Sequence, residues 1–200
     1  MENGTCKARE LDNTMKSPGA KVPLSRTGRG VLLDPDLPSV EEVALLNLAI
    51  ERAIAFDAEG QLSGDLVQGT KNTVNIPARM LHQGFAVTHN HPSGGSFSHD
   101  DVHVLAENKV REMRVIGHQS QDRVYLYRLH FLDGATLEQK RKTASRYLEL
   151  EREIRAQTQT AIEAGRMTGK EVKREFRHLI MSKLKEELLD IVYYARIKLS

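Results

Sequence analysis

The hydrophobic and polar positions in the first half of the chain predict short strands separated by turns. Ser39 to Glu42 has the spacing of a capping box and precedes an apolar run, so a helix is expected over residues 39–50. Pro77 opens a second, short helix that reaches Gln83. Residues 89–95 are expected to form a loop because they contain Pro and two Gly. Strands are predicted at 52–56, 61–67, 73–76 and 85–88.

The second half becomes charged and helical after two further strands. A helix is expected from Ser98 to about Glu112, followed by strands at 114–117 and 124–130. A long helix over 136–163 ends near Gly165, and a second capping box begins at Thr168. The helix that follows carries an apolar stripe at spacings of three to five, namely Val172, Phe176, Leu179, Leu184, Leu188 and Ile191.

These patterns divide the chain into three parts. Residues 1–30 are polar, rich in Gly, Lys and Arg, and lack periodicity, so they are interpreted as a flexible N-terminal arm. Residues 31–135 hold the alternating strands and helices of a folded domain. Residues 136–200 are interpreted as a charged helical hairpin extension.

Composition narrows the class of protein. Hydrophobic residues make up 40% of the chain but aromatic residues only 5%, so the core must be mainly aliphatic. The single cysteine, Cys6, excludes an internal disulfide and a multi-cysteine zinc site. No apolar run approaches the roughly 18 residues that a membrane span needs, and no signal-peptide pattern opens the chain. We therefore expect a cytoplasmic protein without membrane contact, while export as an effector stays open.

Charge is distributed unevenly along the chain. Residues 1–30 hold six Lys or Arg and three Asp or Glu, a net +3, and residues 136–200 hold fifteen and ten, a net +5. Residues 31–135 hold eight and fourteen, a net −6. Nucleic-acid sites normally have a basic footprint, so the acidic middle argues against DNA or RNA as a substrate.

Three side chains in the middle segment are candidate metal ligands. His89 and His91 alternate with Asn90 directly after an apolar strand, and side chains two apart in extended chain point the same way. Asp101 lies one turn into the next predicted helix, where its carboxylate can face back to the strand end. Two neutral imidazoles and one carboxylate leave a fourth position open for water, which is typical of catalytic zinc sites.

Hydrolysis also needs a group that takes a proton from water and passes it to the leaving amine. Glu51 is the preferred candidate because it precedes the strand 52–56, which would bring it to the metal if that strand neighbours 85–88. Glu42 and Glu59 are its rivals. Ser98 is a candidate donor to the bound water or to the oxyanion of a tetrahedral intermediate, and its other interpretation is a helix N-cap.

Together, Glu51, His89-x-His91-Pro92 and Ser98-x-x-Asp101 resemble the JAMM signature of the JAB/MPN metallopeptidase superfamily. The stretch 89–94 and the upstream Gly69-Thr70-x-Asn72-x-Val74 are most similar to the RadC-like branch, and 91–98 resembles JAB domains of phage proteins and polymorphic toxins. The spacing from His91 to Ser98 is one residue shorter than the usual pattern. The similarity covers roughly residues 39–130, which makes 31–135 a JAB/MPN zinc metallopeptidase-like domain.

The resemblance implies a cytidine-deaminase-like α/β sandwich that binds Zn²⁺ through His89, His91 and Asp101, with Glu51 as acid and base and Ser98 in support. It implies hydrolysis of amide bonds in a protein or peptide, including isopeptide bonds to ubiquitin-like proteins. Two alternatives stay open: a catalytically inactive JAB scaffold, and a RadC-like DNA-associated factor. The C-terminal helices are candidates for binding a partner protein or for self-association.

Overall fold

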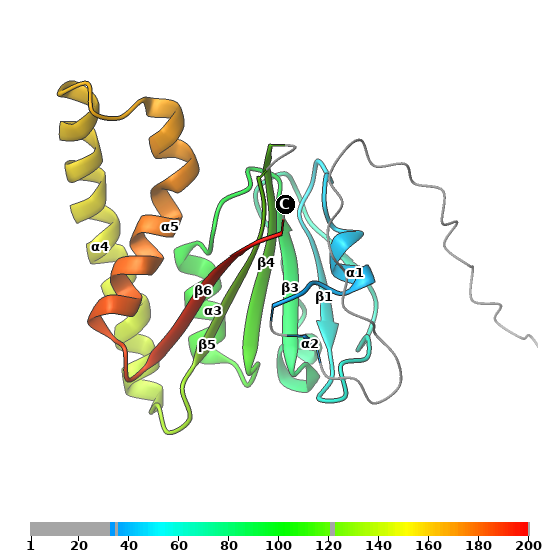
Figure 1. Cartoon of the computed structure of the whole chain (residues 1–200). Helices are drawn as coiled ribbons and strands as arrows, with labels where there is room; N and C mark the ends of the chain where they lie inside the picture. Colours follow the sequence, from blue (N-terminus) through cyan, green and yellow to red (C-terminus); the bar gives the residue numbers. More distant parts are fainter. Residues whose placement is uncertain (1–32, 35, 121–122, 200) are drawn as a thin grey trace, which may run out of the picture.

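A mixed β-sheet runs through the centre of the molecule, and helices pack against it (Figure 1). The computed structural model describes residues 33–34, 36–120 and 123–199, so the expected arm over 1–30 lies outside the described residues. The strands of the described chain are β1 (Arg52–Phe56), β2 (Val67–Gln68), β3 (Ala86–His91), β4 (Glu112–Ser120), β5 (Arg123–Phe131) and β6 (Val192–Lys198). Its helices are α1 (Val40–Val43), α2 (Ala78–Gln83), α3 (His99–Glu107), α4 (Leu137–Glu163) and α5 (Gly169–Glu187).

The order of strands within the described residues is β2-β1-β3-β4-β5-β6. Only β3 and β4 are parallel, and each other neighbouring pair among the described strands is antiparallel. The α/β class expected for the chain is therefore correct. The condition on which the choice of Glu51 depended is met, because β1 and β3 are neighbours: Ala53 pairs with His89 and Phe56 with Ala86.

The central strand β3 is buried along its whole length, and its alternation sorts its side chains between two cores. Val87 belongs to a core that includes residues of α3, α4 and α5. Ala86 belongs to a second core, which Leu45 covers from the N-terminal segment. His89 and His91 share the register of Val87, so they lie on the face of the sheet that the long helices cover.

The long helices are fixed to the sheet by one continuous apolar core. The buried residues of α4 and α5 include Tyr147, Leu150, Ile180 and Leu184, and Leu105 of α3 lies in the same core. Burial of one such aliphatic side chain contributes about 1.5–3 kcal/mol. The α4 and α5 helices lie side by side as a long hairpin (Figure 1), and α5 leads directly into β6.

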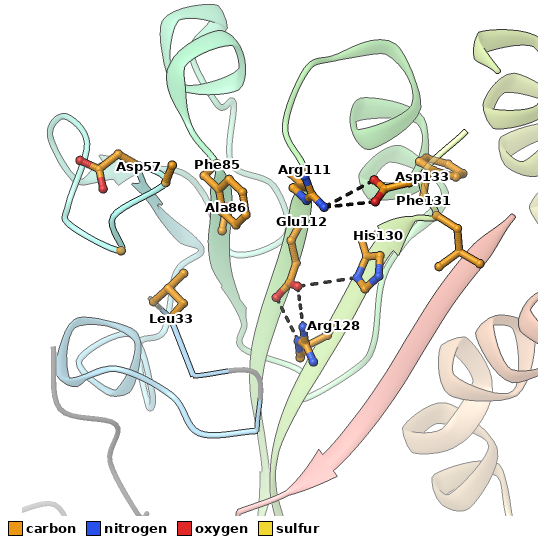
Figure 2. Close-up of a pocket in the computed structure, with 13 residues that line it drawn as sticks. Leu33, Asp57, Phe85, Ala86, Arg111, Glu112, Arg128, His130, Phe131 and Asp133 are labelled. Carbon is orange, nitrogen blue, oxygen red and sulfur yellow. Dashed lines mark hydrogen bonds and ion pairs between the residues drawn. The ribbon is translucent and has the colours of Figure 1, made fainter. Parts of the chain in front are cut away.

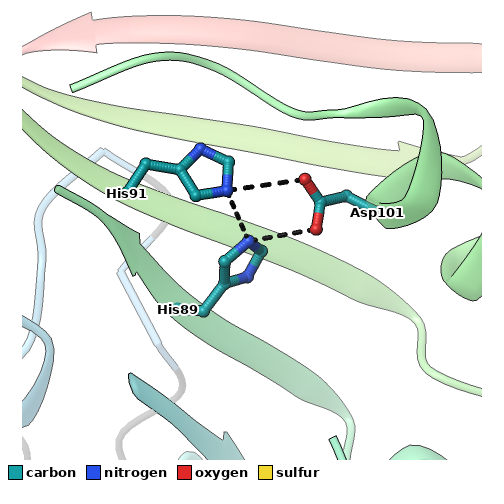
Figure 3. Close-up of side chains that lie close together, drawn as sticks. All are labelled: His89, His91 and Asp101. Carbon is teal, nitrogen blue, oxygen red and sulfur yellow. Dashed lines mark hydrogen bonds and ion pairs between the residues drawn. The ribbon is translucent and has the colours of Figure 1, made fainter. Parts of the chain in front are cut away.

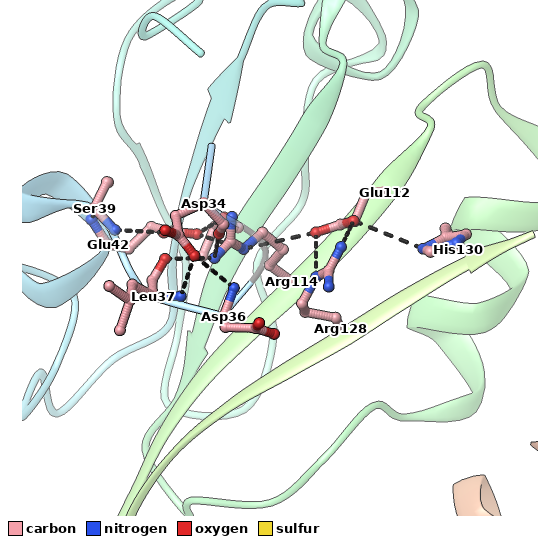
Figure 4. A network of polar contacts seen from close by, with 10 residues as sticks. Asp34, Asp36, Leu37, Ser39, Glu42, Glu112, Arg114, Arg128 and His130 are labelled. Atoms are coloured by element: carbon pink, nitrogen blue, oxygen red, sulfur yellow. Dashed lines mark hydrogen bonds and ion pairs between the residues drawn. The ribbon is translucent and has the colours of Figure 1, made fainter. Parts of the chain in front are cut away.

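The opposite face carries a buried charge network around Arg114 of β4 (Figure 4). Its Nε lies 3.0 Å from Glu42 Oε1, and both side chains are fully buried. Its Nη2 donates to the carbonyls of Asp34 and Leu37. Glu42 also accepts from Thr88 Oγ1 at 2.7 Å and caps α1 through Ser39. This network attaches the segment before β1 to the sheet.

The structure corrects several predictions in the first half. The helix expected over 39–50 ends at Val43, and Asn47 takes a left-handed conformation with φ of 63°. Residues 44–50 form turns and irregular chain, from which Leu45 enters the second core. The strand expected at 61–67 is reduced to Val67–Gln68 and a bridge at Leu62, and 73–76 forms no strand. The short helix after Pro77 is confirmed as α2.

Further corrections concern the ends of elements and the C-terminus. β3 continues through His91, where a loop was expected, and α3 ends at Glu107 rather than near Glu112. The strands at 114–117 and 124–130 are confirmed and are longer. The long helix over 136–163 is confirmed as α4. The second helix is confirmed as α5 but ends at Glu187, so Leu188 and Ile191 of the expected stripe lie in the turn after it. Val192–Lys198 forms β6, which pairs with β5, so residues 136–200 are not helical throughout.

No helix in the described part of the chain is long and apolar enough to cross a membrane.

Candidate metal centre

His89, His91 and Asp101 meet at the carboxyl end of β3 (Figure 3). The two imidazole Nε2 atoms lie 3.0 Å apart. Asp101 Oδ1 lies 3.1 Å from His89 Nε2, and Oδ2 lies 3.6 Å from His91 Nε2. Both histidines are buried, and the Asp101 side chain is 16% exposed. One nitrogen from each ring and one carboxylate therefore converge on one point.

The turn after β3 fixes the direction of the His91 ring. His91 Nδ1 lies 3.0 Å from the Gly95 carbonyl oxygen. Because a carbonyl only accepts hydrogen bonds, Nδ1 is the donor and Nε2 keeps its lone pair for an electrophile. Gly94 has φ of +72°, and a Cβ on Gly117 of β4 would lie 2.9 Å from the Gly94 carbonyl oxygen. The two glycines thus let the turn fold tightly against β4.

Asp101 is held by the start of α3. Ser98 is the N-cap, and its backbone N–H donates to Asp101 Oδ2 at 2.6 Å. The Ser98 hydroxyl donates to the same oxygen at 2.7 Å. The capping interpretation of Ser98 is therefore correct, and in this arrangement its hydroxyl proton points at the carboxylate. The shortened spacing between His91 and Ser98 still brings Asp101 within reach of both rings.

Electrostatics favour a neutral His91 imidazole next to an ionised Asp101 carboxylate. Burial, together with the charge of His89, lowers the pKa of His91 to about 4. Burial alone would raise the pKa of Asp101, but His89, His91 and the Ser98 backbone outweigh it and hold that pKa far below its usual range. Both groups are in the protonation states that metal ligation requires.

Glu51 lies just before β1 and lines a cavity that His91 and Asp101 also line. Its backbone N–H donates to the Thr70 carbonyl, and the Gly69 N–H donates to the Glu51 carbonyl. A Cβ on Gly69 would lie 2.1 Å from the Thr73 carbonyl oxygen, so only glycine fits this turn. Burial raises the pKa of the Glu51 carboxyl to about 7, and the charge of His89 opposes that increase.

The rival carboxylates lie elsewhere. Glu42 is fully buried in the ion pair with Arg114 on the opposite face of the sheet. Glu59 is exposed in the turn after β1. Of the three candidates for a base, Glu51 is the one that lines the cavity with His91 and Asp101.

A cavity of about 420 Å³ opens onto two of the three converging side chains, His91 and Asp101. Sequence reasoning anticipated Glu51, His91, Ser98 and Asp101 in its wall but missed Arg177, which comes from α5. No local spacing links Arg177 to the other residues, because the fold of the hairpin brings it there. The remaining wall includes Asn72, Thr73, Asn75, Ile76, Leu81, Asp100, His103, Val104 and Met113.

The donor set fits a tetrahedral metal ion. Ligand atoms at about 2.05 Å from a tetrahedral centre are about 3.3 Å from one another. The observed separations of 3.0, 3.1 and 3.6 Å bracket that value. A mixed set of two nitrogens and one carboxylate oxygen suits a borderline divalent cation such as Zn²⁺.

A second cavity of about 370 Å³ lies at the other end of the strands, beside the first residues of β3 and β4 (Figure 2). Its charged groups neutralise one another, because Arg128 Nη2 lies 2.7 Å from Glu112 Oε2 and Arg111 pairs with Asp133 at 3.4 Å. The cavity has none of the three converging ligands, so it is a weaker candidate for a catalytic centre.

Comparison of the chain with protein-family models, with curated proteins and with solved structures found no match. Function is therefore inferred from the chemistry of the site.

Proposed function

We propose that this chain is a zinc-dependent peptidase or isopeptidase of the JAB/MPN kind, which hydrolyses an amide bond in a protein or peptide. The observation that carries the proposal is the convergence of His89 Nε2, His91 Nε2 and an Asp101 oxygen at separations of 3.0–3.6 Å. The buried carboxylate of Glu51 in the same cavity supports hydrolysis over a purely structural metal.

The residues divide the work as follows. His89, His91 and Asp101 would hold Zn²⁺, and the fourth position stays free of protein ligands among the described residues. When bound, Zn²⁺ acts as a Lewis acid and lowers the pKa of a coordinated water to about 7.

Glu51 takes the proton of the attacking water and returns it to the leaving amine nitrogen. A base is most effective when its pKa lies near the working pH, and the pKa of about 7 for Glu51 meets that condition. Ser98 keeps the Asp101 carboxylate in place through two hydrogen bonds. Its hydroxyl can support an oxyanion only after it rotates away from Asp101.

The arrangement of the sheet is compatible with the expected cytidine-deaminase-like sandwich. The ligand pair lies at the end of a central strand, the carboxylate ligand at the start of the following helix, and the base beside an antiparallel neighbour. The Gly69–Val74 segment, which resembles the RadC-like branch, forms the turn that pairs with Glu51.

Metal content and cleavage test the proposal together. The purified full chain is dialysed against buffered zinc and analysed by mass spectrometry for metal, then incubated with a diverse peptide library and a panel of ubiquitin-like fusions. We expect about one zinc per chain and cleavage of at least one substrate. Glu51→Gln should retain zinc and lose about 10²–10⁴-fold in rate, because general acid-base catalysis has that magnitude.

Glu59→Gln is the matched control, since this carboxylate is exposed and distant from the cavity. It should leave both zinc content and cleavage unchanged. Zinc content well below one equivalent in the wild type would end the proposal. Stoichiometric zinc with cleavage unchanged by Glu51→Gln would exclude Glu51 as the base, and zinc without cleavage of any substrate would favour the inactive scaffold.

A further inference from the structure

An arginine from outside the sequence motif lies in the wall of the cavity at the candidate centre. Arg177 of α5 lines the cavity together with Glu51, His91 and Asp101. It also lines an adjoining cavity with Ser98, His99 and Tyr147, so it lies where the two spaces meet. Its charge acts on Glu51 and on His91.

The guanidinium group of Arg177 has no partner in the described chain. It forms neither a hydrogen bond nor an ion pair within 4.0 Å with any residue that the structure describes. Two other arginines of the C-terminal segment are paired in contrast: Arg146 of α4 bonds to Glu187, and Arg196 of β6 bonds to Glu175. An unpaired cation at a cavity wall, near two carboxylates that it does not touch, is available to an anion from outside.

The position of Arg177 suits a substrate group better than the reacting carbonyl. Because no ion pair within 4.0 Å joins it to Asp101 or Glu51, its nitrogens stand outside contact distance of the candidate centre. This leaves Arg177 free to bind a carboxylate that lies beside the scissile amide in the same cavity. The fork of a guanidinium group matches a carboxylate with two parallel hydrogen bonds.

We propose that Arg177 binds a carboxylate of the substrate and so selects amide bonds that have an acidic group beside them. The inference rests on the proposed function, since it assumes that the scissile amide sits at the zinc site. The carboxylate has two sources, the free C-terminus of a short leaving group or an Asp or Glu side chain, and both present the same anion to Arg177.

The arm of Arg177 is held in place by its surroundings. Its Cδ lies 3.6 Å from where a Cβ on Gly95 would be, so the side chain passes along the turn that fixes His91. The flanking α5 residues Ile180 and Met181 are fully buried in the shared core. A side chain directed by packing loses less entropy on binding than a free surface arginine.

Three thiol probes test the inference on the zinc-loaded full chain by isothermal titration calorimetry. Mercaptoacetyl-alanine has a C-terminal carboxylate, mercaptoacetyl-alaninamide has none, and mercaptoacetyl-aspartamide has a side-chain carboxylate. Their common thiolate is a ligand for zinc. We expect the wild type to bind at least one acidic probe about tenfold or more tightly than the neutral probe, as charge-assisted hydrogen bonds allow. Which acidic probe binds more tightly identifies the source of the carboxylate.

Variants assign the preference to one side chain. Arg177→Met should bind all three probes with the affinity of the neutral one, and Arg177→Lys should keep part of the preference. Arg174→Met, one turn earlier on α5 and outside the cavity wall, should behave as the wild type. Zinc content and melting temperature are measured for each variant, so that the comparison is made on folded, loaded protein.

The failures are distinguishable. If the wild type holds zinc and binds the neutral and acidic probes equally, the inference on Arg177 is wrong and the zinc proposal stands. If Arg177→Met weakens all three probes by the same factor, the side chain acts on the centre and not on a carboxylate, and the inference is again wrong. If the wild type takes up no zinc, both proposals fall.

Discussion

Asp101→Asn separates two roles that one carboxylate combines in this structure. Oδ2 of Asp101 accepts both Ser98 hydrogen bonds and so caps α3, while Oδ1 lies 3.1 Å from His89 Nε2. Asparagine keeps the size of the side chain and one carbonyl oxygen, which still accepts from the Ser98 N–H. It removes the negative charge, which leaves the candidate metal with two neutral nitrogen ligands and a neutral oxygen.

The two roles differ in size. Loss of a charge near a helix N-terminus costs about 0.3–1 kcal/mol, so the metal-free variant should unfold at nearly the wild-type denaturant concentration. Removing a residue that only orients a metal ligand lowers metal affinity about 10–100-fold. Removing the charge of a ligand itself should therefore lower zinc affinity by about 100-fold or more. At free zinc about 1,000 times the wild-type Kd, zinc stabilises the wild type by about 4.1 kcal/mol and the variant by about 1.4 kcal/mol.

Calorimetric melting with and without zinc measures this difference. For a domain of this size about 1 kcal/mol corresponds to about 2–4 °C, so the zinc-induced rise in Tm should be about 5–11 °C smaller in Asp101→Asn. Asp100→Asn is the matched control: it is the same substitution in the same first turn, at a side chain that is 92% exposed. Equal zinc-induced shifts in wild type and Asp101→Asn would refute the assignment of Asp101 as a ligand.

Three further outcomes follow from the packing. Gly117→Ala should lower the free energy of unfolding by about 1–3 kcal/mol and weaken zinc binding, because the new Cβ would press on the Gly94 carbonyl. Urea unfolding and zinc titration measure the two effects. Gly169→Ala is the control, since the space around Gly169 is open, and it should change neither quantity. Glu112→Gln should lower the free energy of unfolding by up to about 3 kcal/mol at pH 7, because the pKa of Glu112 is about 2 in the folded chain and 4.5 ordinarily. Denaturant titrations should find that the difference from the wild type shrinks as the pH falls from about 4.5 towards 2. A difference that does not change with pH would contradict the reasoning. Tyr194→Phe should cost about 1 kcal/mol, because its buried hydroxyl bonds to the β3–α3 loop, and an unchanged urea midpoint would count against that contact.

The convergence of the three candidate ligands was predictable because it depends on short spacings in the sequence. His89 and His91 lie on one face for any extended backbone, so the prediction of a shared direction was correct although the residues were assigned to a loop. The position of Asp101 could be predicted once a helix was expected to start at Ser98, and the capping pattern of Ser98 and Asp101 indicated that start. The position of Glu51 beside these residues depends on the pairing of β1 with β3, which local sequence patterns do not determine.

Other features depended on contacts between distant segments. The apolar run 43–50 favoured a helix, but its residues cover the sheet as irregular chain, since Leu45 must reach the second core. The strand β6 was missed because a strong helical stripe preceded it. A signal was present in Ile191-Val192-Tyr193-Tyr194, a run of β-branched and aromatic residues after the helix end.

That missed strand changes how the hairpin relates to the candidate centre. β6 pairs with β5 over its whole length, so α5 is tied to the sheet at its C-terminal end and to α4 along its side. The Tyr194 hydroxyl lies 2.9 Å from Ser96 Oγ, and the Tyr147 hydroxyl of α4 donates to the Phe97 carbonyl at 2.8 Å.

Both bonds end on the loop between β3 and α3, whose two ends carry the histidines and Asp101. The hairpin therefore braces the loop that sets the distance between the ligands, and it adds Arg177 to the cavity wall. The charged C-terminal segment thus helps to form the candidate site, even though the residues expected to perform the chemistry all precede it in the sequence.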